Sequence, residues 1–267
     1  MSIEETAAVE APPAPAPRVL VLIATIPARK QFCGWLLNAL AKQTRKPDGV
    51  IFVLDGYGDA PAPATTLPVV AEYRTTALSG AGQRWRVALD LPPEDIIICL
   101  DDDITLLEAP NLVRGLVAAI EKGGGAAAAM GRGADGKFAP PCAFSRGDIM
   151  HGLGCGLTVR AKHLVGLQAF SATVVAAGGP DALGVLGDDD ALVSAYLWKT
   201  GVKIRHAATG NIYAAAGTKT TASSAAREAR KENFETQKLA IKKITGWPWF
   251  AFIPGAPGQV QIPGGAR

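Results

Sequence analysis

The chain has 267 residues, of which 48% are hydrophobic and 19% are charged, and its formal net charge is +3 at pH 7. This composition excludes a chain that is disordered throughout and suffices for one large domain or two small ones. The small net charge does not favour nucleic-acid binding, because nucleic-acid-binding proteins usually carry a concentrated basic face. The densest basic stretch, residues 227–231, also contains Glu228, and we interpret it as a solvated helix face.

The first 17 residues are rich in proline and alanine, and we expect them to form an extended, flexible leader. They contain three glutamates and no apolar core segment, so we expect no signal peptide. No stretch approaches the roughly 20 apolar residues that a membrane span needs. The four cysteines lack the CxxC spacing, which is typical of a reduced setting. We therefore expect a cytoplasmic protein, and the alanine-rich composition favours a bacterial one.

From residue 18 onward, apolar runs alternate with segments of helical periodicity. Residues 19–25 are a continuous apolar run with many β-branched side chains, as in a strand that is covered on both faces. A helical pattern follows over residues 31–43. The next expected elements are a buried strand over residues 49–54, a strand over 69–74, a helix over 81–91 and a strand over 95–100. Strands that alternate with helices favour a doubly wound α/β sheet with parallel pairing.

The later part of the chain continues the pattern less regularly. We expect a helix over residues 111–122, a strand of small residues over 125–131, a helix over 191–200 and a strand over 202–207. In doubly wound sheets, ligands bind beyond the carboxyl ends of the strands. Thr25, Asp55 and the triplet Asp101 to Asp103 directly follow or end predicted strands, so we expect them at one edge.

Two acidic triplets are the strongest chemical signal. Asp101 to Asp103 form an acidic surface loop or, because carboxylate oxygens suit magnesium and manganese, hold a divalent cation together with substrate phosphates. The second triplet, Asp188 to Asp190, precedes the helix over 191–200. Aspartates at a helix start cap it and complement its dipole. An aspartate held there can also act as a general base.

At this point the order of motifs resembles the GT-A type nucleotide-sugar glycosyltransferases, particularly the large inverting family 2 group. The resemblance covers roughly residues 18–206. It is carried by "VLIATIPAR" with "LLNALAKQTRKPDGVIFVLDG", "LSGAGQRWRVAL", "ICLDDDITL" as the DXD motif, "HGLGCGLTVRAKHL", and "GDDDALVSAYLWKTG" as the acidic pair that opens the catalytic helix. Both acidic motifs are triplets and Asp189 replaces the family's usual glutamate, so the register and the stereochemical outcome, inverting or retaining, stay open.

The resemblance implies an α/β protein with the GT-A (nucleotide-diphospho-sugar transferase) fold, in which a mostly parallel doubly wound sheet carries helices on both faces. It implies a single catalytic domain over residues 18–245, with a nucleotide-binding half over 18–106 and an acceptor half over 107–245. The leader over 1–17 and a Pro/Gly-rich tail over 246–267 flank it. In the tail, aromatic side chains either pack on the core, which we favour, or make a peripheral membrane contact; they are Trp247, Trp249, Phe250 and Phe252.

The resemblance also implies substrates and roles. The donor is a nucleotide sugar, with UDP-sugar favoured, and the acceptor is a carbohydrate or another hydroxyl compound. Asp190 is the expected general base and Asp189 orients the acceptor. The expected ligands of a Mn²⁺ or Mg²⁺ cofactor are Asp101, Asp103 and His206. The expected nucleotide-binding residues are Thr25, Pro27, Arg29, Asp55, Arg84, Asp101 and Asp102, with Arg84 beside the diphosphate or the sugar and Asp102 reaching the ribose.

Two alternatives remain. A sugar-phosphate nucleotidyltransferase shares the architecture and the carboxylate-bound metal, but it usually has a glycine-rich first loop, and here no glycine follows Arg29 until Gly34. A non-catalytic relative that binds a nucleotide sugar is the second alternative. The carboxylates in both motifs speak against it, because a binding module needs no base.

Overall fold

The computed structural model describes residues 16–123, 125–133, 138–139, 148–152, 155–183, 189–207, 209–214 and 227–247. Within these residues, ten strands form one sheet in the order β3-β2-β1-β4-β10-β6-β11-β9-β7-β8. Their bounds are Val19–Thr25 (β1), Gly49–Leu54 (β2), Val69–Arg74 (β3), Ile96–Asp101 (β4), Ala126–Ala128 (β6), Gly131–Gly133 (β7), Phe138–Ala139 (β8), Asp148–Gly152 (β9), Cys155–Arg160 (β10) and Ile204–His206 (β11). A separate two-stranded sheet pairs β5 (Ile104–Glu108) with β12 (Asn211–Ala214).

The sheet has two characters. From β3 to β4 all pairs are parallel, as expected. β10 then pairs antiparallel with both β4 and β6, and beyond it only the β6–β11 pair is parallel among the described strands. The sheet is therefore mixed. Its parallel part contains β1, β2 and β4, whose carboxyl ends lead to Thr25, Asp55 and Asp101. The antiparallel β10 separates these strands from β6 and the strands beyond it.

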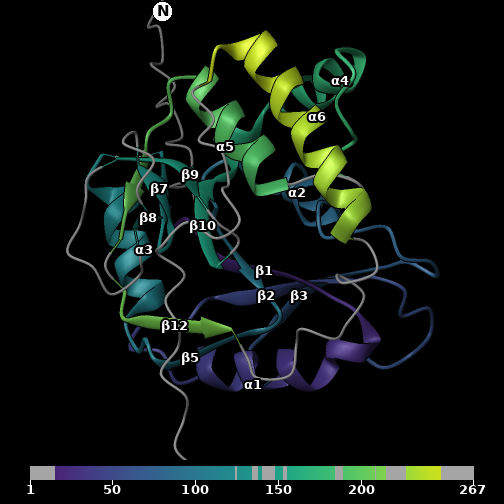
Figure 1. Cartoon of the computed structure of the whole chain (residues 1–267). Helices are drawn as coiled ribbons and strands as arrows, with labels where there is room; N and C mark the ends of the chain where they lie inside the picture. Colours follow the sequence, from purple (N-terminus) through teal and green to yellow (C-terminus); the bar gives the residue numbers. More distant parts are fainter. Residues whose placement is uncertain are drawn as a thin grey trace, which may run out of the picture.

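Helices cover both faces of this sheet (Figure 1). α1 (Lys30–Leu40) and α3 (Leu112–Glu121) pack on one face, whereas α2 (Gln83–Ala88), α4 (Leu167–Ala176), α5 (Asp189–Lys199) and α6 (Arg227–Thr245) pack on the other. Two short 3₁₀ helices, η1 (Pro27–Arg29) and η2 (Ala161–Leu164), follow β1 and β10. None of the described helices combines the length and the apolar character that a membrane crossing requires.

The alternation of side chains along β4 decides where the first acidic triplet points. Ile97 and Cys99 belong to the core under α2 and α5, whereas Ile98 and Leu100 belong to the core under α1 and α3. Because successive strand residues point to opposite faces, Asp101 continues the first set and faces α2. Asp102 continues the second set and turns toward η1.

The C-terminal tail is described only to Trp247. Trp247 is 1% exposed and belongs to the core under α5 and α6. For this residue, the favoured expectation that the tail aromatics pack on the core holds. Its burial removes it from any membrane contact. Trp249, Phe250 and Phe252 lie outside the described residues, as do most of the leader and Asp188.

Candidate active site

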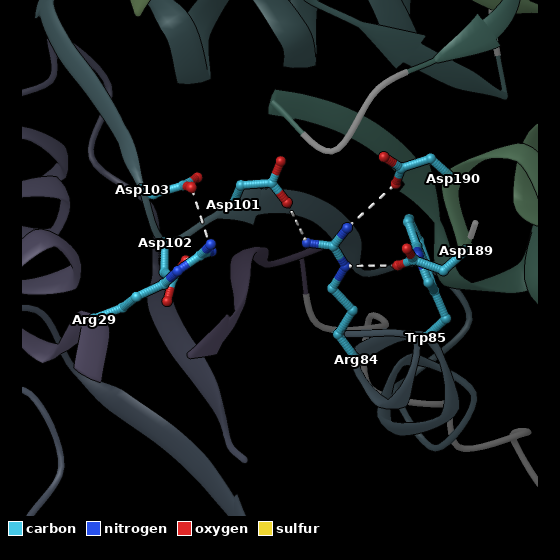
Figure 2. A network of polar contacts seen from close by, with 8 residues as sticks. All are labelled: Arg29, Arg84, Trp85, Asp101, Asp102, Asp103, Asp189 and Asp190. Atoms are coloured by element: carbon cyan, nitrogen blue, oxygen red, sulfur yellow. Dashed lines mark hydrogen bonds and ion pairs between the residues drawn. The ribbon is translucent and has the colours of Figure 1, made fainter. Parts of the chain in front are cut away.

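Arg84, on α2, lies at the centre of the candidate site. Its Nη1 is 2.9 Å from Oδ1 of Asp101, at the end of β4. Its Nε is 3.0 Å from Oδ2 of Asp189 and its Nη2 is 3.3 Å from Oδ1 of Asp190, both in the first turn of α5. Each guanidinium nitrogen thus contacts a different carboxylate (Figure 2). The structure therefore brings the expected metal strand and the expected catalytic helix to one buried side chain.

Burial makes these contacts strong. The Arg84 side chain is only 3% exposed, and burying a guanidinium without counter-charges is costly. Desolvation lowers the pKa of Arg84, but the carboxylates of Asp189, Asp101 and Asp190 outweigh it, and the pKa lies well above its usual value. Arg84 is a permanent positive charge in this position.

Trp85 adds a second donor to the same carboxylate. Its indole Nε1 donates a hydrogen bond to Oδ2 of Asp189 at 3.0 Å, beside the Arg84 Nε. Trp85 is fully buried, and its polar contact is not among the contacts predicted from the sequence. The signal was available, because a buried indole N–H usually has a hydrogen-bond partner. Asp189 is thus held by two neighbouring residues of α2.

Arg29, on η1, forms a second arginine contact with the first triplet. Its Nη1 is 3.0 Å from Oδ1 of Asp102 and 3.3 Å from Oδ2 of Asp103. Burial raises the pKa of Asp102 to about 6, although Arg29 opposes this shift. Burial also raises the pKa of Asp103. The three consecutive aspartates are therefore divided between two arginines, Asp101 with Arg84 and the other two with Arg29.

Asp55, at the end of β2, is occupied by the chain itself. Its Oδ1 accepts hydrogen bonds from the Thr75 hydroxyl at 2.9 Å and from the Ser79 amide and hydroxyl at 2.7 and 2.6 Å. Its Oδ2 accepts one from the Gly80 amide at 3.0 Å. Asp55 thereby fixes the turn that leads into α2 and Arg84. A contact of Asp55 with a nucleobase stays a prediction.

The remaining expected residues lie at different depths. Thr25 is buried at the end of β1, and Pro27 is exposed at the start of η1. His206 is buried at the end of β11, in register with Ala128 of β6. Because β10 and β6 lie between β4 and β11, the strands of Asp101 and His206 are about 14 Å apart at the usual strand spacing.

The expected three-residue metal set is therefore not assembled. Within the described parts of the chain, no three His, Cys, Asp or Glu side chains are grouped so that they could hold a metal ion. Two intervening strands keep His206 away from Asp101 and Asp103, and sequence order alone does not show these strands. Asp101 and Asp103 are the candidate ligands that lie in the cluster, and a metal contact of His206 stays a prediction.

These two carboxylates do fit a divalent cation. Their side chains are 38% and 22% exposed, compared with 3% for Asp102. The cluster in Figure 2 contains five carboxylates and two guanidinium groups, which gives it a formal charge of −3. In addition, Oδ2 of Asp102 is buried without a hydrogen-bond partner. Mg²⁺ and Mn²⁺ commonly take one or two protein carboxylates and complete their shell with phosphates and water.

Comparisons with known proteins identify the fold. No model of a known protein family matches the chain, and no curated protein sequence matches it significantly. Solved structures do match. TarS residues 1–349 from S. aureus give a TM-score of 0.55 at 16% identity, over 84% of this chain and 65% of that one. The mannosyltransferase PcManGT from Pyrobaculum calidifontis, in complex with GDP-Man and Mn²⁺, gives 0.54 at 17% identity, over 86% of this chain and 65% of that one.

A third match is GalNAc-T7 with UDP, GalNAc and Mn²⁺, with a TM-score of 0.50 and 14% identity over 77% of this chain and 45% of that one. The chain thus spans less than two thirds of the length of each of these structures. All three are glycosyltransferases. The likeness confirms the α/β class and the fold expected from the sequence: this chain has the GT-A fold, which these glycosyltransferases share.

Proposed function

We propose that the protein is a metal-dependent glycosyltransferase that moves a sugar from a UDP-sugar to an acceptor hydroxyl. One observation carries the proposal. Asp101 and Asp190 come from opposite halves of the chain, yet both contact the guanidinium of Arg84, at 2.9 and 3.3 Å. The carboxylate of Asp101, which can hold a cation beside the leaving diphosphate, thus lies close to the carboxylate of Asp190, which can accept the proton of the attacking hydroxyl. A transfer reaction requires these groups to be close together.

Asp101 and Asp103 would hold the Mn²⁺ or Mg²⁺ ion. When bound, the ion neutralises the negative charge that develops on the departing diphosphate. The negative charge of the cluster and the solvent exposure of these two side chains support this assignment. Two of the solved structures with this fold were obtained with Mn²⁺.

Asp190 would be the general base. Its side chain is 14% exposed, so it is close to the surface of the cluster. In the reaction, the Asp190 carboxylate takes the proton of the acceptor hydroxyl while the acceptor oxygen bonds to the anomeric carbon. The bond between that carbon and the diphosphate oxygen breaks, and its electron pair leaves with the diphosphate. Asp189, held by Arg84 and Trp85, keeps the first turn of α5 in place.

The nucleoside would lie along the ends of β1 and β2. Thr25, Pro27 and Arg29 come from the end of β1 and from η1, and Asp102 adjoins Arg29. Asp55 would act on this pocket through the turn at residues 75–80 that it fixes. We keep UDP as the favoured nucleotide. Of the solved structures above, one contains UDP and another GDP-Man, so the choice of nucleotide is a matter for experiment.

The test is a thermal-shift titration with UDP, GDP, CDP and ADP, each with and without Mn²⁺. The proteins are the wild type, Asp103→Asn, and Glu121→Gln, a control that removes one carboxylate from the exposed end of α3. A ligand at 100 times its Kd stabilises the native state by about 2.7 kcal/mol, which for a chain of this size is a Tm increase of roughly 5–10 °C. We expect UDP with Mn²⁺ to raise the Tm of the wild type and the control but not of Asp103→Asn.

Turnover completes the test. We expect the wild type to release UDP from at least one UDP-sugar in a donor and acceptor panel with Mn²⁺. Release of pyrophosphate from UTP and a sugar phosphate would point instead to a nucleotidyltransferase. Metal-dependent UDP binding with neither reaction across the panel would leave a binding protein, and the absence of any metal-dependent nucleotide response would contradict the proposal outright.

A further inference from the structure

Arg84 is shared between the two halves of the site. It contacts Asp101, which is 17 residues away in sequence, and Asp189 and Asp190, which are 105 and 106 residues away. Figure 2 shows the guanidinium between the carboxylate of Asp101 on one side and those of α5 on the other. A single rigid planar group therefore connects the expected donor side to the expected acceptor side.

The contacts of Arg84 on the two sides differ in their burial and in the number of hydrogen bonds that hold the carboxylate. On the acceptor side, Oδ2 of Asp189 accepts hydrogen bonds from Arg84 and from the Trp85 indole, and Asp189 is 13% exposed. On the donor side, Asp101 is 38% exposed, so solvent and ions reach it most easily. A ligand that binds this cluster therefore meets Asp101 first, and the contact between Arg84 and Asp189 remains when the contact between Arg84 and Asp101 is weakened.

The N-terminal end of α2 is also held by close contacts. Gly82 starts this helix against the backbone of Ala182 and Leu183, so closely that an added Cβ would lie 2.4 Å from the Ala182 carbonyl oxygen. The turn before the helix is held by Asp55. Because these contacts hold the N-terminal end of α2, we take the Arg84 side chain, rather than a movement of the helix, to respond to a changed contact at Asp101.

We propose that Arg84 is a positioning residue that transmits the state of Asp101 to Asp189 and Asp190. This inference rests on the proposed function, because it assigns a bound cation to Asp101 and the acceptor to Asp190. A cation at Asp101 competes with the Arg84 Nη1 for the same carboxylate. The guanidinium is then held mainly by the two α5 carboxylates, and their geometry changes. Loading of the donor side thus sets the arrangement of the base.

The transmission has a thermodynamic counterpart. A coupling between two sites is reciprocal, so a change at Asp190 alters cation binding at Asp101 as much as the reverse. A ligand shifts such an equilibrium only through a difference in its interaction with the two arrangements. Here that difference is the contact between Arg84 and Asp101, which is present without a bound cation and weakened when a cation occupies Asp101.

The test uses the indole N–H of Trp85 as a reporter, observed by NMR in ¹⁵N-labelled protein and assigned with Trp85→Phe. Asp101→Asn removes one charge from the Arg84 Nη1 and has no direct contact with Trp85. We expect Asp101→Asn to move the Trp85 signal by more than the Glu121→Gln control does. In an Arg84→Lys background, or Arg84→Gln if the lysine variant does not fold, we expect Asp101→Asn to leave the signal where it was.

A second arm adds UDP with Mg²⁺, which is diamagnetic. We expect the Trp85 signal of the wild type to move with ligand concentration, and this response to be lost in the Arg84 variant even where its backbone amides still show binding. An unmoved signal in Asp101→Asn overturns the inference. So does an equal movement with and without Arg84. The first arm needs no nucleotide, so a failure of all nucleotides to bind contradicts the proposed function separately.

Discussion

The indole nitrogen of Trp85 lies 3.0 Å from Oδ2 of Asp189, and this hydrogen bond fastens the first turn of α5 to α2. Trp85→Phe keeps the buried ring and removes the donor. Because hydrogen bonds to charged groups contribute about 1.5–3 kcal/mol, we expect the free energy of unfolding to fall by about that amount in urea titrations. Trp35→Phe, at a side chain that is 51% exposed, is the matched control, and equal stability losses in both variants would contradict the prediction.

Gly82 and Gly34 form a pair of substitutions with opposite expected signs. At Gly82 an added Cβ would lie 2.4 Å from the Ala182 oxygen and 2.7 Å from the Leu183 Cα, so the backbone must move. Overpacking of this kind costs about 1–3 kcal/mol. At Gly34, inside α1, nothing lies within 4 Å of the added Cβ.

We therefore expect Gly82→Ala to lower the Tm and Gly34→Ala to raise the free energy of unfolding by about 0.5–1 kcal/mol, as an alanine inside a helix does. Differential scanning calorimetry of the two variants checks both signs. A neutral Gly82→Ala would show that the segment at residues 182–183 adapts without strain, and the fixed position of α2 would then lose its support.

Asp190→Asn separates chemistry from binding. General acid–base catalysis contributes about 100-fold to 10,000-fold, and we expect transfer with the best donor and acceptor to fall within that range. UDP with Mn²⁺ should still bind, because Asp101 and Asp103 are intact, and its affinity should change only by the coupling through Arg84. Initial rates and isothermal titration on the same preparations give both quantities. Full activity in Asp190→Asn would assign the base elsewhere.

His163, on η2, gives a pH dependence whose sign follows from its surroundings. Burial lowers its pKa, the cations Lys162 and Arg160 lower it further, and Glu94 opposes them. The unfolded chain therefore binds a proton at His163 more readily than the folded chain does. As the pH falls through the unfolded-state value of about 6.5, protonation of His163 reduces the free energy of unfolding.

In His163→Gln this contribution is absent. We expect the loss of stability between pH 7.5 and pH 5.5 to be smaller in the variant than in the wild type, measured by urea titration at each pH. The comparison cancels the other titrating groups. A larger loss in the variant would mean that protonated His163 stabilises the fold.

Local sequence patterns were sufficient for the parallel part of the fold. The runs at residues 19–25 and 69–74 coincide with β1 and β3, and the helix pattern over 111–122 differs from α3 by one residue at each end. These elements are continuous in sequence; β1 is buried along its length and α3 has one apolar face, so their local patterns are clear. β10 was not predicted as a strand. Its antiparallel place between β4 and β6 depends on long-range pairing that no local pattern encodes.

The same division holds for the site. The acidic residues were found because they follow buried strands or open a helix, both of which are visible locally. The contacts that organise them were not found, because Arg84 meets Asp189 across 105 residues and Asp55 meets Ser79 across 24. The metal role of His206 stays a prediction that rests on chain order alone. Chain order placed it after the catalytic helix, but two strands separate β11 from β4.

The position of Arg84 has a consequence for biosynthesis. When the ribosome has made the chain only as far as residue 188, Arg84 has Asp101 but neither Asp189 nor Asp190. A guanidinium that is 3% exposed in the finished fold would then have only one of its three counter-charges, and burying it in that state would cost several kcal/mol. We therefore expect the native packing around Arg84 to be completed only after α5 is made. A helix made late then balances the charge of a residue made early.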